Sequence, residues 1–265
     1  MKKIILFLFF LSIAVVSCRT VPFTGRKQLS LVPDASVLTL SLQQYNDFIV
    51  KASVSTDIRN KALVDKVGRN LANAVTQYYM SHGMASELKN FKWEFNLINS
   101  NQINAFCMPG GKIVVYTGIL PYTQDENGLA VVLSHEIAHA LAKHANERIS
   151  QQIPVYLGSV GLDIGLALSN QSVQTRNLAQ NVFGLGSTVA FTLPFSRKHE
   201  LEADRIGLIL MAIAGYNPQL SINFWQRMAT VTGKMPEFIS THPSDSRRIA
   251  EIQKYIPEAM RYYKR

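Results

Sequence analysis

The stretch His135-Glu136-Ile137-Ala138-His139 places two histidines four residues apart within an apolar segment. Residues at this spacing lie on one face of a helix, one turn above the other. Both imidazoles can therefore reach a single Zn²⁺, about 2.0–2.1 Å from each nitrogen. Glu136 lies one residue round the helix, near enough to act as general base toward a water at that metal. The stretch thus predicts a helical zinc site with two ligands and a base.

A catalytic zinc site needs a third protein ligand and an open coordination position. In the HExxHxxGxxH arrangement that ligand is another histidine, but here Ala142 and Ala145 stand at the glycine and histidine positions. His144 lies about 140° round the helix from His139 and is expected to be a structural hydrogen-bonding residue. The third ligand is therefore expected from another segment of the chain.

A second predicted helix, further along the chain, carries three acidic residues near its start: Glu200, Glu202 and Asp204. Glu200 and Asp204 share one face, whereas Glu202 points about 200° away from Glu200. Small residues at Ala203 and Gly207 would let this helix approach the HExxH helix closely. We therefore expect Glu200 to be the third ligand and Asp204 to orient a ligand imidazole. The alternative is that these acids form a solvated face.

Composition excludes several classes of protein. Of the 265 residues, 47% are hydrophobic, which excludes a disordered or low-complexity chain. The net charge is +9, but no run of five or more Lys/Arg occurs, so no nucleic-acid partner is expected. Two cysteines cannot make a disulfide framework. No apolar run reaches about 18 residues, so no membrane-spanning helix is expected.

The amino terminus has the pattern of a targeting segment. Lys2 and Lys3 precede an apolar run from Ile4 to Val16, which is typical of a signal peptide. The run ends at Val15-Val16-Ser17-Cys18, which resembles a bacterial lipobox. Such a signal implies cleavage before Cys18 and lipid attachment to its thiol. The alternative is an ordinary signal peptide followed by an incidental cysteine.

Three segments follow from this pattern. Residues 1–17 are the expected lipoprotein signal peptide, and residues 18–33, with two prolines and a glycine, are the expected lipidated tether. Residues 34–265 then form the expected catalytic domain. Two or three acyl chains on Cys18 would anchor the protein stably, because a single chain gives only marginal membrane binding.

Hydrophobic periodicity predicts helices, then a small sheet, then more helices, which is an α+β fold that is mainly helical. One helix begins near Asp34, and a second ends at His82-Gly83. Strands are predicted at 92–98, 103–107 and 112–117, with a turn at Pro109-Gly110-Gly111 between the last two.

The HExxH helix is expected to begin with a capping box, Thr123-x-x-Glu126, and to run to about Ser150. Residues 153–168 are apolar but contain Pro154 and three glycines, and a core-packed helical hairpin is expected there, with membrane contact as the alternative. Further helices are predicted at about 196–214, 218–231 and 244–255.

Four motifs occur in one order along the chain: HEIAHALAKH (135–144), SRKHELEADRIG (196–207), AGYNP (214–218) and THPSDSRRI (241–249). Together with NAFCMPGGKIVVYTGIL (104–120) they resemble the gluzincin metallopeptidase family of the CAAX prenyl protease and HtpX type. The resemblance extends from about Pro33 to Ile252. It is nearest to the short periplasmic lipoprotein proteases such as LoiP and BepA, here without the C-terminal repeat domain of BepA.

The resemblance implies a zincin fold with a small sheet beside the HExxH helix. It implies one Zn²⁺ per chain, held by His135, His139 and Glu200, with Glu136 as catalytic base. Asp204 matches the acid one turn after the ligand glutamate.

Two further residues take their roles from the same resemblance. His242 matches a histidine near the metal that stabilises the oxyanion or plugs the open metal position. Asn104 matches an asparagine that faces the substrate or intermediate. Cys107-Met108 departs from the family pattern, which affects only local packing.

The function expected from these features is that of a zinc metalloendopeptidase anchored in the bacterial envelope, which degrades misfolded or stalled envelope proteins. The strand at 112–117 would pair with an extended substrate. The alternative is a latent or non-proteolytic, chaperone-like assembly factor for outer-membrane proteins, and a weaker one is a zinc-dependent non-peptidase hydrolase. Arg19 follows Cys18 where inner-membrane retention in some bacteria uses Asp, so an outer-membrane anchor facing the periplasm is expected. The oligomeric state stays open.

Overall fold

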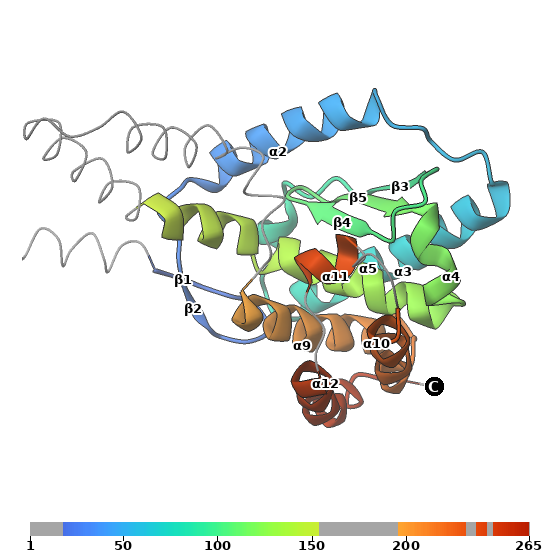
Figure 1. Cartoon of the computed structure of the whole chain (residues 1–265). Coiled ribbons are helices and arrows are strands. Elements are labelled where there is room, and N and C mark those ends of the chain that lie inside the picture. Colours follow the sequence, from blue (N-terminus) through green and yellow to red (C-terminus); the bar gives the residue numbers. More distant parts are fainter. Residues whose placement is uncertain (1–17, 154–195, 232–236, 243–245, 265) are drawn as a thin grey trace, which may run out of the picture. The chain divides into compact units, whose positions relative to one another are not determined.

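The computed structural model describes residues 18–153, 196–231, 237–242 and 246–264 (Figure 1). The chain divides into two units, one containing Met1–Val37 and Lys143–Leu193 and the other Leu38–Ala142 and Pro194–Arg265. The predicted signal peptide and residues 154–168 of the predicted hairpin lie outside the described residues. None of the helices in the described ranges combines the length and the apolar character that a membrane crossing needs.

The first unit begins with a hairpin. Strand β1 (Cys18–Thr20) pairs antiparallel with β2 (Lys27–Leu29), so that Cys18 lies opposite Leu29. Val21, in the turn between the strands, is buried. Strand pairing thus orders part of the expected tether at residues 18–33, while the lipid attachment expected there stays a prediction.

Contacts within the same unit join this hairpin to the helical residues 144–153. Arg26 donates two hydrogen bonds to Glu147, of 2.8 Å to Oε1 and 2.6 Å to Oε2. The Leu31 N–H donates to Ser150 Oγ, and the Asn146 amide donates to the Val32 carbonyl, each at 2.9 Å. The paired contact of the Arg26 guanidinium with the Glu147 carboxylate is the strongest of these contacts, because both of its hydrogen bonds are charge-assisted.

We expect Arg26→Ala to lower the free energy of unfolding by about 3 kcal/mol, because Glu147 would be left charged and buried. The side chains of Arg26 and Glu147 are only 14% and 5% exposed. The measurement is the urea midpoint of the purified protein. Lys66→Ala is the control, because its ion pair with Glu126 is exposed to solvent and should contribute little to stability. Equal losses in the two variants would contradict the prediction.

The second unit contains a three-stranded sheet with the order β3-β5-β4. Strands β3 (Glu94–Ile98) and β5 (Lys112–Tyr116) are parallel, and β4 (Ala105–Met108) is antiparallel to β5. Because β5 is paired on both sides, the expectation that residues 112–117 pair with a substrate is wrong. Within the described residues, β4 lies at an edge of this sheet.

The predicted turn between β4 and β5 is confirmed. Gly110 and Gly111 have φ of +92° and +83°, a conformation that glycine adopts without steric cost. A Cβ atom on Gly111 would also lie 2.8 Å from Trp93 Cε3.

Two helices precede the sheet as predicted. Helix α2 (Asp34–Ile49) begins at the expected residue, and α3 (Ile58–Ser81) is capped by His82 and followed by Gly83 at φ +69°. Short helical turns lie between the larger elements: η1 (Ala85–Leu88), η2 (Thr117–Ile119) and α4 (Leu120–Thr123).

The HExxH helix, α5 (Glu126–Leu141), differs from the prediction at both ends. Its N-cap is Asp125, whose Oδ1 accepts from the Gly128 N–H at 2.8 Å, whereas Thr123 belongs to α4 and donates to the Leu120 carbonyl. The helix ends at Leu141 rather than near Ser150, because Lys143 takes a left-handed conformation with φ +53°. Nothing in the local sequence signals this end, since neither glycine nor proline occurs there.

Helix α9 (Arg197–Ile213) packs along α5. Ser196 caps it by accepting the His199 N–H at 3.3 Å. A Cβ atom on Gly207 would lie 3.1 Å from Ser134 Oγ and 3.2 Å from the His135 nitrogen. The close approach predicted for this glycine face is therefore confirmed, and it brings the start of α9 to the two histidines.

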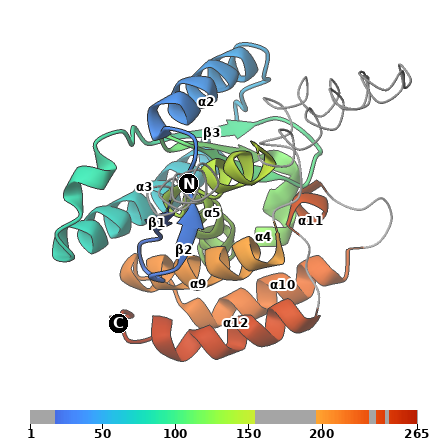
Figure 2. The ribbon, with the colours of Figure 1, turned by 90° about the vertical axis from the view of Figure 1, so that its left-hand side faces the viewer.

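The remaining helices are η3 (Pro218–Leu220), α10 (Ser221–Ala229), α11 (Glu237–Thr241) and α12 (Ser246–Ala259). Helix α12 lies alongside α9 (Figure 2). It continues past Tyr255, where the sequence pattern predicted its end. The described residues are thus mainly helical with small sheets, in agreement with the α+β prediction.

Candidate metal centre

Helix α5 brings His135 and His139 together on one face, as their spacing predicts. Their Nε2 atoms are 3.0 Å apart, and both side chains are buried. The imidazoles meet edge to face, with ring centres 4.7 Å apart. Almost every residue of α5 from Gly128 to Leu141 is buried, so the two rings project into the protein interior.

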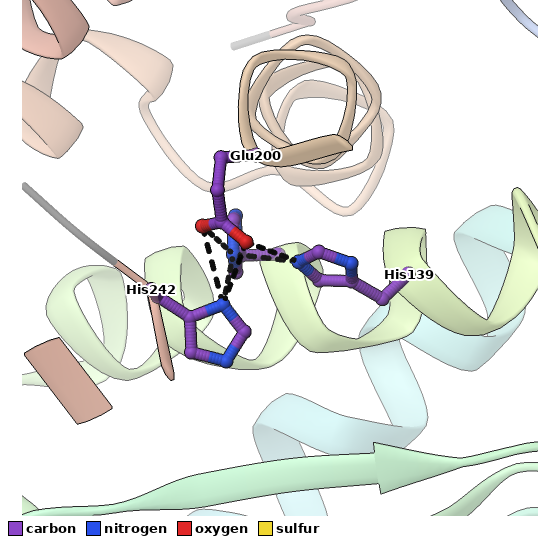
Figure 3. Close-up of side chains that lie close together, drawn as sticks. His139, Glu200 and His242 are labelled. Atoms are coloured by element: carbon purple, nitrogen blue, oxygen red, sulfur yellow. Dashed lines mark hydrogen bonds and ion pairs between the residues drawn. The ribbon is translucent and has the colours of Figure 1, made fainter. Parts of the chain in front are cut away.

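Helix α9 supplies a carboxylate to this pair (Figure 3). Glu200 Oε2 lies 3.3 Å from His135 Nε2, and Glu200 Oε1 lies 3.4 Å from His139 Nε2. Burial alone raises the pKa of Glu200, but the neighbouring His242 and Arg248 hold it well below its ordinary value. The carboxylate is therefore ionised, as a metal ligand must be.

His242, directly after α11, contributes a fourth donor atom. Its Nδ1 lies 3.2 Å from His135 Nε2 and 3.1 Å from Glu200 Oε1. Its Nε2 lies on the other side of the ring, 3.3 Å from Glu136 Oε1. The His242 imidazole thus lies between the other donor groups of the cluster and Glu136, the expected base.

The donor atoms are close enough together to hold one metal ion. Those of His135, His139, Glu200 and His242 all lie within 4.8 Å of one another. Four donors about 2.0–2.1 Å from one zinc ion would be about 3.4 Å apart. The five separations given above, 3.0 to 3.4 Å and involving both Glu200 oxygens, are near this value. Imidazole and carboxylate are also the ligand types that zinc accepts.

Asp204 takes the place predicted for it. Its Oδ1 lies 3.0 Å from His135 Nδ1, the ring nitrogen that faces away from the cluster. Burial raises the pKa of Asp204, but Arg248 more than offsets this and the pKa is lowered. A carboxylate on Nδ1 would hold the imidazole with Nε2 available to a bound metal.

Glu136 is buried beside the cluster, where burial raises its pKa above the ordinary value. Its Oε1 makes no hydrogen bond within the part of the chain that the structure describes, although His242 Nε2 is near. The carboxylate also accepts a hydrogen bond from the Cys107 main chain, on β4. A buried acceptor without a hydrogen bond fits a group that takes up a proton during a reaction.

The other predicted residues lie outside the cluster. Asn104 Oδ1 accepts the Ala105 N–H at 2.9 Å, at the start of β4. Glu202 is not among the clustered donors, but it is buried rather than solvated, so the solvated acidic face is wrong for all three acids of α9. His144 is buried and also absent from the cluster.

Arg248 is not singled out by any local pattern, although the THPSDSRRI motif contains it. Arg248 is buried, donates to Asp204 and lies over Trp225, with its guanidinium carbon 3.7 Å from the ring centre. No local pattern separates it from the adjacent Arg247, which is exposed.

Metal binding should release a proton. Burial lowers the pKa of His135, but Asp204 and Glu200 more than compensate and raise it from 6.5 to about 9. The imidazole is thus protonated in the metal-free protein at pH 7, and a metal must displace that proton. We expect zinc affinity to rise about tenfold per pH unit between about pH 7 and 8.5, as measured by chelator competition.

The stability of the metal-free protein should instead fall as the pH rises. Because the folded-state pKa of His135 is raised, its stabilisation is complete below pH 6.5 and is lost as the pH rises through 9. Thermal unfolding of the metal-free protein should therefore occur at lower temperature above pH 8. A zinc affinity that does not change between pH 7 and 8.5 would contradict the raised pKa.

Two histidines one turn apart on a helix, a glutamate from a second helix and an adjacent buried glutamate define a metallopeptidase of the HExxH class. Comparison with protein families agrees with this class. Residues 68–256 match the model of peptidase family M48, and the chain belongs to that family.

Curated relatives come from mitochondria and from bacteria. The chain is 41% identical over 181 residues to "Mitochondrial metalloendopeptidase OMA1" of Schizosaccharomyces pombe, covering 66% of this chain and 50% of the relative. It is 32% identical over 248 residues to "Metalloendopeptidase OMA1, mitochondrial" of Homo sapiens, covering 91% and 46%. It is 33% identical over 187 residues to "Beta-barrel assembly-enhancing protease" of Escherichia coli, covering 68% and 38%. The chain thus spans about half the length of these relatives or less.

Proposed function

We propose that this protein is a zinc-dependent endopeptidase of the bacterial envelope that acts on misfolded or stalled envelope proteins. One observation carries the proposal: four converging donor atoms lie beside a buried carboxylate, Glu136, whose Oε1 makes no hydrogen bond in the described part of the chain. Membership of peptidase family M48 and the printed names of the relatives support proteolysis.

Glu136 would move the protons of the reaction. When bound, zinc would supply a Lewis acid that activates water and polarises the scissile carbonyl. Glu136 would accept the proton of the attacking water at Oε1, the atom that lies toward His242. Its raised pKa makes it a stronger base for that proton, which it would then pass to the leaving amine. We propose that Asn104 faces the substrate, because it directly precedes the edge strand β4.

Edge strand β4 is the element best placed to bind an extended peptide. Its partner β5 covers one side, and the Cys107 N–H on β4 bonds to Glu136, so the base lies beside this strand. Added strands are held mainly by main-chain hydrogen bonds, which are nearly independent of sequence. Unfolded or misassembled proteins, whose strands are unpaired, are therefore the substrates that we propose.

The anchor and the location belong to the same proposal. Cys18 is exposed and is the first residue of β1, so its thiol is accessible for lipid attachment. Since the relatives come from both mitochondria and bacteria, the lipobox-like pattern before Cys18 carries this part of the proposal. We place the protein at the outer membrane, facing the periplasm, near the short lipoprotein type of the family.

A latent or chaperone-like assembly factor for outer-membrane proteins is the second candidate, and His242 favours it. Nδ1 of this residue takes the fourth donor place of the cluster, and Nε2 lies beside Glu136. A site closed in this way would bind unfolded proteins without cleaving them.

His242→Ala is the experiment that tests the proposed function. If His242 closes the site, removing its imidazole should raise the rate of cleavage of a fluorescently labelled unfolded protein by about tenfold or more. A chelator should abolish cleavage and zinc should restore it. His82→Ala, which alters an exposed histidine, is the control. A lower rate would assign His242 to oxyanion stabilisation, and no cleavage in either form would favour the assembly factor.

A further inference from the structure

Arg248 is a buried cation on α12, directly behind the proposed metal site. It is 3% exposed. Its Nε donates to Asp204 Oδ2 at 2.7 Å and its Nη2 donates to Asp204 Oδ1 at 2.8 Å, so the carboxylate is held at two points. The guanidinium carbon lies over the Trp225 ring, 3.7 Å from its centre. Paired hydrogen bonds and an aromatic face together leave this side chain little freedom.

The third nitrogen of the guanidinium connects two other parts of the site. Arg248 Nη1 lies 3.0 Å from Glu200 Oε2 and donates to the main-chain oxygen of His242 at 3.1 Å. The His242 nitrogen donates in turn to the Phe238 carbonyl at 2.9 Å, within the end of α11. The main-chain nitrogen of His242 is thus held by the end of α11, and its main-chain oxygen is held by Arg248.

We propose that Arg248 is a positioning residue that sets where the His242 imidazole lies relative to the metal ligands. The inference rests on the proposed metal site. Arg248 takes its own position from Asp204 and Trp225, and it transmits that position to His242 through the main-chain oxygen. His242 Nδ1 then lies 3.1 Å from Glu200 Oε1, in the fourth donor place.

A purely structural role makes a different prediction. Arg248 also neutralises the buried carboxylates of Glu200 and Asp204, and removing a buried cation is destabilising whatever happens to His242. Lysine separates the two roles, because an ammonium keeps the charge but cannot reproduce the planar fork that reaches Asp204 and His242 together.

The test is a double-mutant cycle on the full chain with Co²⁺ as probe. Arg248→Lys, His242→Ala and the double variant are compared by the dissociation constant for Co²⁺ and by its visible absorption bands. We expect Arg248→Lys alone to weaken Co²⁺ binding about 10- to 100-fold and to shift the bands toward those of His242→Ala. In the His242→Ala background the same substitution should change the dissociation constant less than about threefold.

Equal weakening in both backgrounds would overturn the inference, because Arg248 would then act through the two carboxylates or through His135, whose Nδ1 lies 3.3 Å from Arg248 Nη2, and not through His242. Failure of the wild-type chain to bind one Co²⁺ would overturn the proposed metal site and this inference with it. Arg247→Gln, an exposed neighbour, is the control and should change neither readout.

A second variant serves if Arg248→Lys does not fold. Trp225→Leu keeps the guanidinium and its charge but removes the aromatic face under it. It should weaken Co²⁺ binding in the wild-type background and have less effect once His242 is alanine. An equal effect in both backgrounds would again overturn the inference.

Discussion

Glu136→Gln should abolish peptide cleavage while zinc stays bound at one ion per chain. Glutamine has nearly the same shape as glutamate but cannot accept the proton that the proposed mechanism places on Oε1. Loss of a positioned general base lowers rates by about 10²–10⁴-fold. Glu136 is not among the four converging donors, so the metal site should be preserved. The measurements are the cleavage rate of an unfolded protein substrate and zinc per chain by atomic absorption.

The two readouts together make this test specific. Loss of both cleavage and zinc would mean that the variant had disrupted the centre, and would leave the base unassigned to Glu136. Retained cleavage of the unfolded substrate would rule out Glu136 as the base. His199→Gln offers a comparison, because His199 is another buried residue of the same region that is absent from the donor cluster.

Glu200→Gln should lose zinc, whereas Glu202→Gln should keep it. Both glutamates are buried on α9, but only the carboxylate of Glu200 lies 3.3–3.4 Å from the two imidazole nitrogens. A neutral amide is a poor replacement for an anionic ligand. The affinity should therefore fall by more than the roughly 10- to 100-fold that loss of an outer partner costs.

The pair of variants is matched in residue type, helix and burial, so a difference between them isolates coordination. The measurements are zinc stoichiometry after dialysis and zinc affinity by chelator competition. Equal zinc retention in the two variants would remove Glu200 from the ligand set. Equal zinc loss would indicate that α9 had moved as a whole.

Local sequence patterns predicted most of the individual elements. The glycine turn before β5 and the end of α3 at His82-Gly83 were predicted correctly, because glycine at these positions has a direct steric reason. The end of α5 was not predicted. Lys143 adopts a left-handed conformation that lysine seldom takes, and in the structure its Nζ lies 2.7 Å from Asp34. A contact so distant in sequence leaves no local pattern.

The order of the strands in the sheet could not be predicted from the sequence either. Each strand pattern marks a strand but does not say which neighbours it pairs with, since pairing depends on long-range contacts. The substrate strand expected at 112–117 is the central strand, and β4 is one of the two edge strands of this sheet.

The sequence by itself predicted the candidate metal site. The spacing of His135 and His139 on one helix, with Glu136 beside them, follows from helical geometry alone. The choice of Glu200 over Glu202 followed from the same geometry on a second helix. These predictions needed only relations between residues a few positions apart.

Tertiary structure decided how the groups of the candidate site are held together. His242 lies 3.1 Å from Glu200, and Arg248 joins Asp204, Glu200 and the His242 main chain at one guanidinium. Arg247 and Arg248 are adjacent and identical in the sequence, and only the packing of α12 against α9 buries one and exposes the other. Because these charges are buried, each depends on its partners, so the proposed role of Arg248 arises from the assembled core.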